Sequence, residues 1–201
     1  LTVKNLDKIY TKLNKKINDS GYFHYKNLFS FDNCKSVIEY LNTLRPKIHI
    51  PYSKIPWGYG NLINDSNLEW IYNNKIINNV CKEYLAGNFV FNHLMVNNKV
   101  PWIGPEVEWH QEIFNVNTYA PGGNTTPTSW KNFLQIYIAL DKHTLENGCL
   151  KIVPDSHKLG VLPSEDIVNS LLGHKRRIPY DTMNEIFKNY KVKNVLMNPG
   201  D

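Results

Sequence analysis

Apolar side chains recur at every third or fourth position in three stretches of the first half of the chain. The stretches are Val3–Ile17, Asp32–Leu44 and Asn67–Leu85, and this spacing predicts helices that bury one face. Asp32 is expected to cap the start of the second helix, because its carboxylate can accept hydrogen bonds from free backbone N–H groups. Gly87 is expected to end the third, because Gly readily adopts the left-handed conformation that stops a helix.

From residue 88 onward the pattern changes to short apolar runs separated by Pro, Gly and Asn, which predict strands. The expected strands are Asn88–Asn98, Val107–Tyr119, Phe133–Leu140, Cys149–Val153 and Val192–Met197. Helices followed by strands predict a mainly β fold with flanking helices, a sandwich or a barrel, rather than alternating βαβ units. We expect a single domain over residues 1–201, with a helical buttress over about 1–87 and a β core over about 88–201.

Residues 159–189 interrupt the strand pattern with a long insertion that contains the basic run Gly173–Arg177. Insertions of this length in a compact domain are often lids or substrate-binding loops. A plain surface excursion explains the pattern equally well, so both interpretations stand.

The composition is that of an ordinary globular protein, with 42% hydrophobic and 20% charged residues. No apolar run approaches the roughly 20 residues that a membrane span needs, and the first residues show no secretory signal. Cys34, Cys81 and Cys149 are odd in number and form no CxxC pair, which argues against a disulfide framework or a zinc ribbon. We therefore expect a reduced, cytoplasmic setting and no membrane partner.

The net charge of +5 raises the question of nucleic-acid binding. The basic residues are mostly Lys spread along the chain, with Arg only at Arg45, Arg176 and Arg177. Surfaces that bind a phosphate backbone usually cluster their charge and favour Arg. The excess of Lys, Asn and Ile is more typical of an AT-rich coding sequence, and we expect no nucleic-acid partner.

The segment Glu106–Glu112 carries the most informative residues of the chain. On a strand, successive side chains point to opposite faces, so His110 and Glu112 would share one face and Gln111 would point away. An imidazole and a carboxylate placed in this way supply two ligands of the two-His, one-carboxylate motif, which leaves three positions open on Fe(II). Taken alone, His-x-Glu more often belongs to a surface strand with a solvated Glu. The surrounding motifs therefore have to decide whether these two residues are metal ligands.

The motifs at Trp109–Glu112 and Glu146–Gly160 resemble those of the phytanoyl-CoA dioxygenase family, whose members are Fe(II)- and 2-oxoglutarate-dependent oxygenases. Trp109–Glu112 resembles the family's Trp-His-Gln-Asp signature, and Glu146–Gly160 resembles its block built around ENG and PGSH. Further likeness lies in Gly21–Phe23, Asn97–Pro101, Leu134–Asp141 and Val195–Asp201. The motifs follow one another in the family's order over nearly the whole chain.

The resemblance implies a double-stranded β-helix, a jelly-roll of the cupin type, incomplete at its C-terminus. On this pattern His110 and Glu112 are the first two ligands of Fe(II), and 2-oxoglutarate is the cosubstrate. The third ligand, a His, and the Arg that pairs with 2-oxoglutarate are expected beyond Asp201. The implied activity is that of a dioxygenase that hydroxylates a small organic substrate with O2 and releases succinate and CO2.

Three further residues are candidates to bind the cosubstrate. Lys99 falls where the family places such a Lys, and a buried carboxylate needs a cation or several donors; a surface Lys in a Lys-rich chain is the alternative. Gln135 and Tyr137 alternate on the expected strand Phe133–Leu140. They are candidates either to donate to 2-oxoglutarate or to pack in the core or at the rim of the site.

The chain departs from the family pattern at two positions. Glu112 stands where the family usually has Asp, and its extra methylene still lets the carboxylate reach iron but changes how it binds. Asp155 replaces the Gly of the PGSH turn, and Asp tolerates a positive φ better than most residues. His157 of the same block is expected to have a structural role rather than to bind metal.

Two other functions fit the same scaffold. A catalytically silent β-helix protein would bind a metabolite without redox chemistry, and the change at Glu112 favours it. A cupin-like isomerase would use another divalent metal and consume no O2. Substrate specificity lies in loops that vary freely on a given scaffold, so the sequence names no substrate, and it carries no signal for an oligomeric state.

Overall fold

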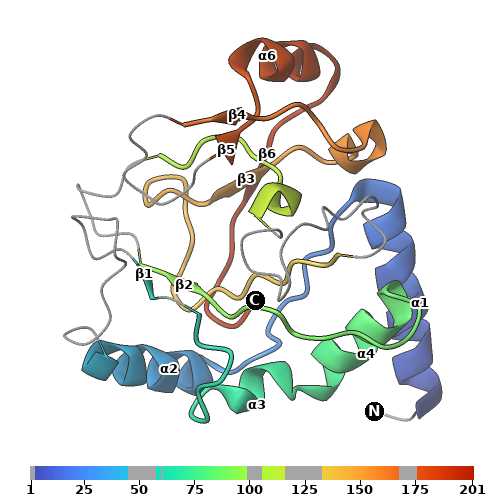
Figure 1. Ribbon diagram of the computed structural model, residues 1–201. Coiled ribbons are helices and arrows are strands. Elements are labelled where there is room, and N and C mark those ends of the chain that lie inside the picture. Colours follow the sequence, from blue (N-terminus) through green and yellow to red (C-terminus); the bar gives the residue numbers. More distant parts are fainter. Residues whose placement is uncertain (1–2, 45–57, 60, 99–105, 116–132, 168–175) are drawn as a thin grey trace.

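Helices dominate the first half of the described structure, and short strand pairs lie mainly in the second (Figure 1). The computed structural model describes residues 3–44, 58–59, 61–98, 106–115, 133–167 and 176–201. The helices are α1 (Val3–Ser20), α2 (Phe31–Leu44), α3 (Glu69–Tyr72), α4 (Lys75–Tyr84) and α6 (Tyr180–Asn189), with the 3-10 turns η1 (Glu112–Asn115) and η3 (Ser156–Leu159). The strands are β1 (Gly58–Tyr59), β2 (Val96–Asn97), β3 (Leu150–Ile152), β4 (Glu165–Asp166), β5 (Arg176–Arg177) and β6 (Lys193–Val195).

Helix α1 forms where the apolar spacing predicts it. Tyr10, Leu13 and Ile17 are buried along it, and α1 contacts α4. The helix ends just before Gly21, whose φ of +81° is free of strain only for glycine. A Cβ at position 21 would lie 2.5 Å from Nδ1 of His157, so this glycine also lets the turn η3 approach the end of the helix.

Helix α2 is also predicted correctly, but its cap is not Asp32. The helix begins at Phe31 and Asp32 lies in its first turn. The hydroxyl of Ser30 accepts a hydrogen bond from the Asn33 N–H at 3.1 Å, and Oδ1 of Asn33 accepts one from the Ser30 N–H at 3.1 Å. This reciprocal pair satisfies two backbone donors at the start of the helix, as a capping box does.

The single helix predicted over Asn67–Leu85 is wrong, because the chain forms two helices there, α3 and α4. Asn74 separates them with a ψ of 127°, outside the helical region. Its Oδ1 accepts hydrogen bonds from the backbone N–H groups of Ile76 at 2.9 Å and Ile77 at 3.3 Å. Asn74 therefore caps α4 and restarts the helix, a local alternative that Asn side chains offer the backbone.

Two of the five predicted strands are confirmed, one within Cys149–Val153 and one within Val192–Met197. They are β3 and β6, which pair antiparallel with Leu150 opposite Val195. An isolated antiparallel bridge between His143 and Met197 continues the same pairing. This pair brings two segments that are far apart in sequence side by side.

Three predicted strands are wrong in whole or in part: Asn88–Asn98, Val107–Tyr119 and Phe133–Leu140. The first is a strand only at β2, which pairs with β1. The described part of the second is loop up to Gln111 and then the turn η1, and residues 116–119 lie outside the described structure. The third runs as loop; its Ala139 exchanges backbone hydrogen bonds with Gly200 at 2.8 Å and Asp201 at 3.1 Å. A strand needs a ladder of backbone hydrogen bonds to a neighbouring strand along its length. A run of apolar residues does not ensure that such a neighbour is present.

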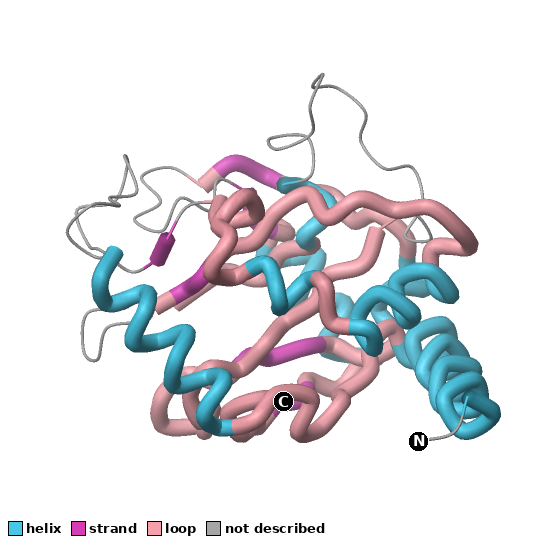
Figure 2. The backbone as a smooth tube through the Cα atoms, turned by 90° about the horizontal axis from the view of Figure 1, so that it is seen from below, coloured by secondary structure: helices cyan, strands magenta, loops and turns pink. Residues whose placement is uncertain are grey.

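The described residues contain three two-stranded antiparallel pairs, β1–β2, β3–β6 and β4–β5, with helices around them. Long stretches of loop connect these elements (Figure 2). The arrangement is one of few strands with flanking helices, and the double-stranded β-helix stays a prediction. None of the helices in the described ranges is both long enough and apolar enough to cross a membrane.

The predicted insertion at 159–189 has regular structure in its described part. Its two arms pair as β4 and β5, with Glu165 opposite Arg177, and helix α6 follows. Residues 168–175, which include the first part of the basic run, lie outside the described structure.

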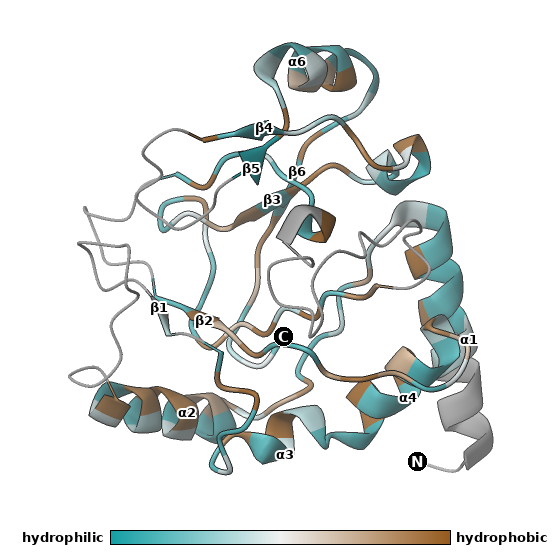
Figure 3. Cartoon of the chain, in the orientation of Figure 1, coloured by the Kyte–Doolittle hydropathy of each residue, from teal (hydrophilic) through white to brown (hydrophobic). Residues whose placement is uncertain are grey.

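Two of the three apolar cores formed by the described residues lie at opposite ends of the molecule (Figure 1). One packs α2, α3 and α4 against residues 134–140, and the other lies beneath α6 and takes in Trp109. Figure 3 shows teal and brown positions side by side on these helices, as amphipathic helices require. The turn η1, yellow-green in Figure 1, lies between the two ends.

The turn that ends at Asp201 is fastened to the segment between α1 and α2. The Asp201 carboxylate accepts hydrogen bonds from the backbone N–H groups of Asn198 and Asn27, each at 3.0 Å, and lies 3.1 Å from Nε2 of His24. Burial alone would raise the pKa of Asp201, but these donors together hold it below its usual value. The carboxylate therefore stays charged although its side chain is only 2% exposed.

Candidate metal centre

His110 and Glu112 lie where a loop turns into η1. Nε2 of His110 is 3.3 Å from Oε1 of Glu112. The two side chains meet by a route other than strand alternation, since residues 106–111 are loop and Glu112 begins a 3-10 turn. The His110 side chain is 17% exposed and the Glu112 side chain 42%, so the imidazole is in the interior and solvent reaches the carboxylate.

The backbone of Glu108 orients the His110 ring. Its carbonyl oxygen lies 2.7 Å from Nδ1 of His110, the distance at which an Nδ1–H group donates. With the proton on Nδ1, a neutral ring has its lone pair on Nε2, the nitrogen that faces Glu112. Histidines that bind metals usually hold their second ring nitrogen in this way.

A positive charge on or beside the His110 ring is favoured next to the Glu112 oxygen. Burial alone would lower the pKa of His110, but the hydrogen bonds to Glu112 and to the Glu108 carbonyl, with the charge of Glu112, raise it above its usual value. A proton on Nε2 supplies the charge, and a divalent cation held by both atoms would replace that proton. The pair therefore has the donor atoms and the electrostatics of a metal site.

The neighbours of His110 in sequence anchor the segment elsewhere. The Trp109 ring packs edge-on against Phe187 of α6, with ring centroids 5.6 Å apart, and the Trp109 carbonyl accepts a hydrogen bond from the Ile178 N–H at 2.8 Å. The Gln111 side chain donates to the Gly160 carbonyl at 3.1 Å. These contacts leave His110 and Glu112 as the members of the motif that face each other.

His93 is a neighbour of the site that the sequence did not single out. Burial lowers the pKa of His93, and the negative charge of Glu112 partly opposes this effect. The field of Glu112 therefore reaches this half-buried ring. His93 belongs to no motif with a recognisable spacing to His110, so no sequence signal marked it.

The other three candidate residues differ in what the structure describes of them. Lys99 lies outside the described residues. Gln135 is exposed on a loop rather than on the expected strand. Tyr137 packs edge-on against the His143 ring, with centroids 5.6 Å apart; the residue is 43% exposed as a whole, yet burial around its hydroxyl raises its pKa.

His157 binds the end of α1. Its Nε2 lies 2.9 Å from the Asn18 carbonyl oxygen. Asp155 beside it has a φ of +68°, the left-handed conformation considered for the Gly position of the family motif, and its N–H donates to the Ser20 carbonyl at 3.0 Å. The turn thus fastens α1 to the second half of the chain.

Within the residues that the structure describes, no group of three His, Cys, Asp or Glu side chains is placed to hold a metal ion. His110 and Glu112 thus stand as a pair there. A pair leaves most of the coordination positions of a metal to other ligands.

Comparison with known proteins places the sequence in a family. The family model "Phytanoyl-CoA dioxygenase (PhyH)" matches residues 17–201, nearly the whole chain. A 49-residue segment is 51% identical to "Dioxygenase lolE1" of Epichloe uncinata; it covers 23% of this chain and 19% of that relative. The chain thus spans only a small part of the curated relative that it matches. The extent of the family match establishes that the chain belongs to the phytanoyl-CoA dioxygenase family.

Proposed function

We propose that the chain belongs to a dioxygenase that binds Fe(II) through His110 and Glu112 and hydroxylates a small organic substrate with 2-oxoglutarate and O2. The observation that carries the proposal is the 3.3 Å approach of the two side chains. Membership of the phytanoyl-CoA dioxygenase family and the likeness to a relative named a dioxygenase support an oxygenase role. The proposed fold is a double-stranded β-helix of the cupin type, with residues 1–87 as its helical buttress and 88–201 as its core.

The two donor atoms fit an iron ion. Ligands about 2.1 Å from a metal on adjacent corners of an octahedron lie about 3 Å from each other. The distance between Nε2 of His110 and Oε1 of Glu112 is 3.3 Å, close to this value. One imidazole and one carboxylate are also the ligand types of iron sites that keep positions open for a chelating acid and O2.

The residues of the chain bind the metal and the cosubstrate and orient the metal ligands. When bound, Fe(II) with 2-oxoglutarate supplies the oxidising chemistry that couples O2 to hydroxylation, with release of succinate and CO2. His110 and Glu112 hold the metal, and the Glu108 carbonyl keeps the ring proton on Nδ1 so that Nε2 is the binding atom. Lys99, Gln135 and Tyr137 remain the proposed contacts of 2-oxoglutarate.

The longer carboxylate of Glu112 is compatible with this role. Its Oε1 lies within 3.3 Å of Nε2 of His110 although the side chain is one methylene longer than that of Asp. We expect the third ligand, a His, and the Arg for 2-oxoglutarate in sequence that follows Asp201.

Succinate release that depends on Fe(II) and 2-oxoglutarate tests the proposal in the native protein that contains this chain. His110→Ala and Glu112→Gln should each lower turnover by more than about 100-fold, because each removes a metal ligand. Glu106→Gln is the matched control, since Glu106 is exposed on the same segment; it should leave turnover unchanged. Intact turnover in His110→Ala would show that the ligand assignment is wrong.

The catalytically silent binding protein is the second candidate. The Glu at position 112, where the family usually has Asp, favours it. Binding of 2-oxoglutarate, measured by calorimetry, without any succinate release in the wild-type protein would support that function over the enzyme.

A further inference from the structure

The side chain of Glu108, whose carbonyl orients His110, is itself held by β5 and α6. Its Oε1 accepts hydrogen bonds from Nη1 of Arg177 at 3.3 Å and from the Tyr180 hydroxyl at 2.9 Å. The backbone and the side chain of Glu108 therefore both make hydrogen bonds. Its backbone contacts the candidate ligand, and its carboxylate contacts residues that lie 69 and 72 positions later in the chain.

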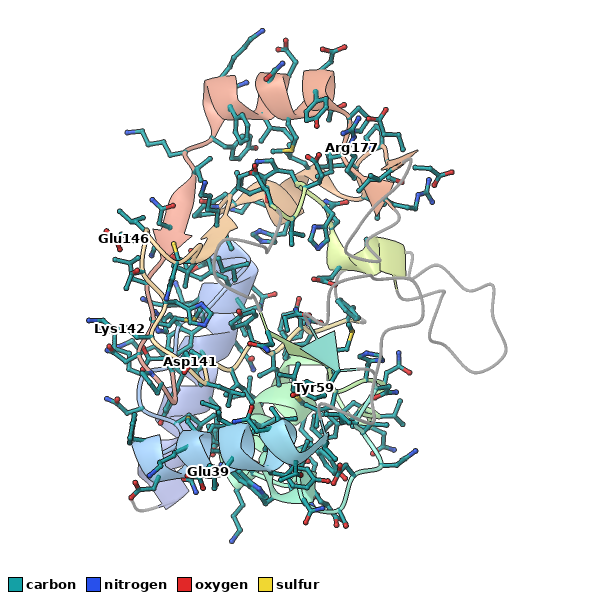
Figure 4. The ribbon with its side chains drawn as sticks, turned by 90° about the vertical axis from the view of Figure 1, so that its left-hand side faces the viewer. Glu39, Tyr59, Asp141, Lys142, Glu146 and Arg177 are labelled. Carbon is teal, nitrogen blue, oxygen red and sulfur yellow. The ribbon has the colours of Figure 1, made fainter. Side chains whose placement is uncertain are left out.

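Arg177 is the centre of this contact. Its Nη1 also donates to the Tyr180 hydroxyl at 2.7 Å, its Nε donates to Glu165 at 2.8 Å, and its guanidinium lies 4.1 Å from the centre of the Tyr180 ring. The side chain is 23% exposed. Figure 4 shows Arg177 beneath α6, on the side that faces η1. A planar guanidinium held at several of its donors has little freedom to move.

The same part of the chain also holds the residues on both sides of His110. Ile178, next to Arg177, donates its N–H to the Trp109 carbonyl at 2.8 Å. Gln111 donates to the Gly160 carbonyl at 3.1 Å and accepts from the Leu162 N–H at 2.9 Å. Residues 108, 109 and 111, on both sides of His110, are thus each bound to described residues between positions 160 and 187.

We propose that Arg177 and Tyr180 are positioning residues for the metal site and act on His110 through Glu108. The inference rests on the proposed function for the identity of the bound metal. In this arrangement the described parts of the insertion, residues 159–167 and 176–189, brace the ligand-bearing loop rather than form a separate excursion. Such a brace is needed because His110 lies on a loop, whose backbone is not held by a strand ladder.

The physical effect is on the orientation of the imidazole. If the Glu108 backbone moves, its carbonyl no longer accepts the Nδ1 proton at 2.7 Å, and the ring loses both its preferred tautomer and its direction. Partners of this kind typically contribute 10- to 100-fold to metal affinity. Because Arg177 acts through one further residue, we expect the lower end of that range.

The test compares Arg177→Met and Tyr180→Phe with Arg176→Met in the protein that contains the full chain. Arg176 is the matched control, because it is the neighbouring Arg on β5 and it contacts Asp166 and the Ser164 carbonyl within the same hairpin. The first readout is the tautomer of His110 in the metal-free protein, from 15N spectra of His-labelled samples at alkaline pH. The second is the affinity for Co(II) alone, measured by calorimetry.

The wild type should show mainly the Nδ1-protonated form. Arg177→Met should shift His110 toward a mixture of tautomers and weaken Co(II) binding about 10-fold, with a smaller change in the same direction for Tyr180→Phe. Arg176→Met should match the wild type in both readouts. A role in folding alone would lower stability without moving the tautomer of the folded fraction.

Each result decides between the two proposals. If Arg177→Met and Tyr180→Phe keep the wild-type tautomer and Co(II) affinity, the positioning role is wrong while the metal site stands. If His110→Ala binds Co(II) as well as the wild type, the metal assignment is wrong. The positioning role is then tested only by the effect of Arg177→Met and Tyr180→Phe on the His110 tautomer. Should Arg177→Met fail to fold, Tyr180→Phe decides, because it removes only one hydroxyl.

Discussion

At the scale of single residues, the departures from the family pattern have local structural solutions. Asp155 takes a φ of +68° where the family has Gly, and its side chain contacts Lys158 at 2.5 Å on the exposed surface. Glu112 is the first residue of η1, and its Oε1 lies 3.3 Å from Nε2 of His110. The sequence predicted both substitutions as points of strain or altered reach, but only the backbone geometry shows how each is accommodated.

Asp155 provides a prediction about stability. Asp155→Ala should lower the free energy of unfolding in urea by about 1 kcal/mol, because Ala pays the full cost of the left-handed conformation. Asp155→Gly should be at least as stable as the wild type. Both variants lose the contact to Lys158, so the difference between them reports the backbone alone. Equal stability of the two variants would contradict this account.

At the scale of elements, hydrophobic periodicity predicted the helices better than the strands. A helix satisfies its backbone within one segment, so the spacing of buried residues in α1 and α2 sufficed. A strand needs a partner elsewhere in the chain, and β3 and β6 pair with each other. The segment Phe133–Leu140 forms backbone hydrogen bonds with Gly200 and Asp201 through Ala139, but these do not extend into a regular ladder. The break at Asn74 was missed because a capping Asn in a helical pattern looks like any other polar position.

Asn74 provides the prediction at this scale. Asn74→Ala should lower the free energy of unfolding by about 1 kcal/mol, because the N–H groups of Ile76 and Ile77 lose their acceptor. Asn73→Ala is the control, since the Asn73 side chain makes only an exposed contact with Glu69 at 3.3 Å. Urea unfolding followed by circular dichroism measures both. A loss of the same size in both variants would show that the cap is not what stabilises α4.

At the scale of the whole molecule, the candidate site depends on contacts that no local pattern contains. The meeting of His110 and Glu112 could be predicted, because the residues are two apart and the motifs around them resemble those of one family. The links from Glu108 to Arg177 and Tyr180 span 69 and 72 residues. A single sequence gives no means of pairing these charges, because any of the chain's 23 Lys and Arg residues could oppose any carboxylate.

The buried Asp201 carboxylate predicts how stability responds to acid. Its pKa is lower in the folded chain than its ordinary value, so its stabilising effect is full above the unfolded pKa of about 4 and is lost as the pH falls through the folded value. Asp201→Asn should therefore lower the free energy of unfolding by about 1–2 kcal/mol at neutral pH, and the difference from wild type should shrink toward pH 3. Urea unfolding across this range measures it.

The control for this prediction is Asp141→Asn, since Asp141 is exposed. It should follow the wild-type curve at every pH. A constant gap between Asp201→Asn and the wild type from neutral to acid conditions would show that ionisation of Asp201 does not stabilise the fold.

The attachment of the last turn to the first connection has a consequence for biosynthesis. His24 and Asn27 find their partner in Asp201, 177 and 174 positions later. A ribosome that adds roughly 5–20 residues per second therefore exposes the link between the first two helices for many seconds before the residue that locks it emerges. The link between the first two helices therefore cannot make these contacts until translation has passed position 201.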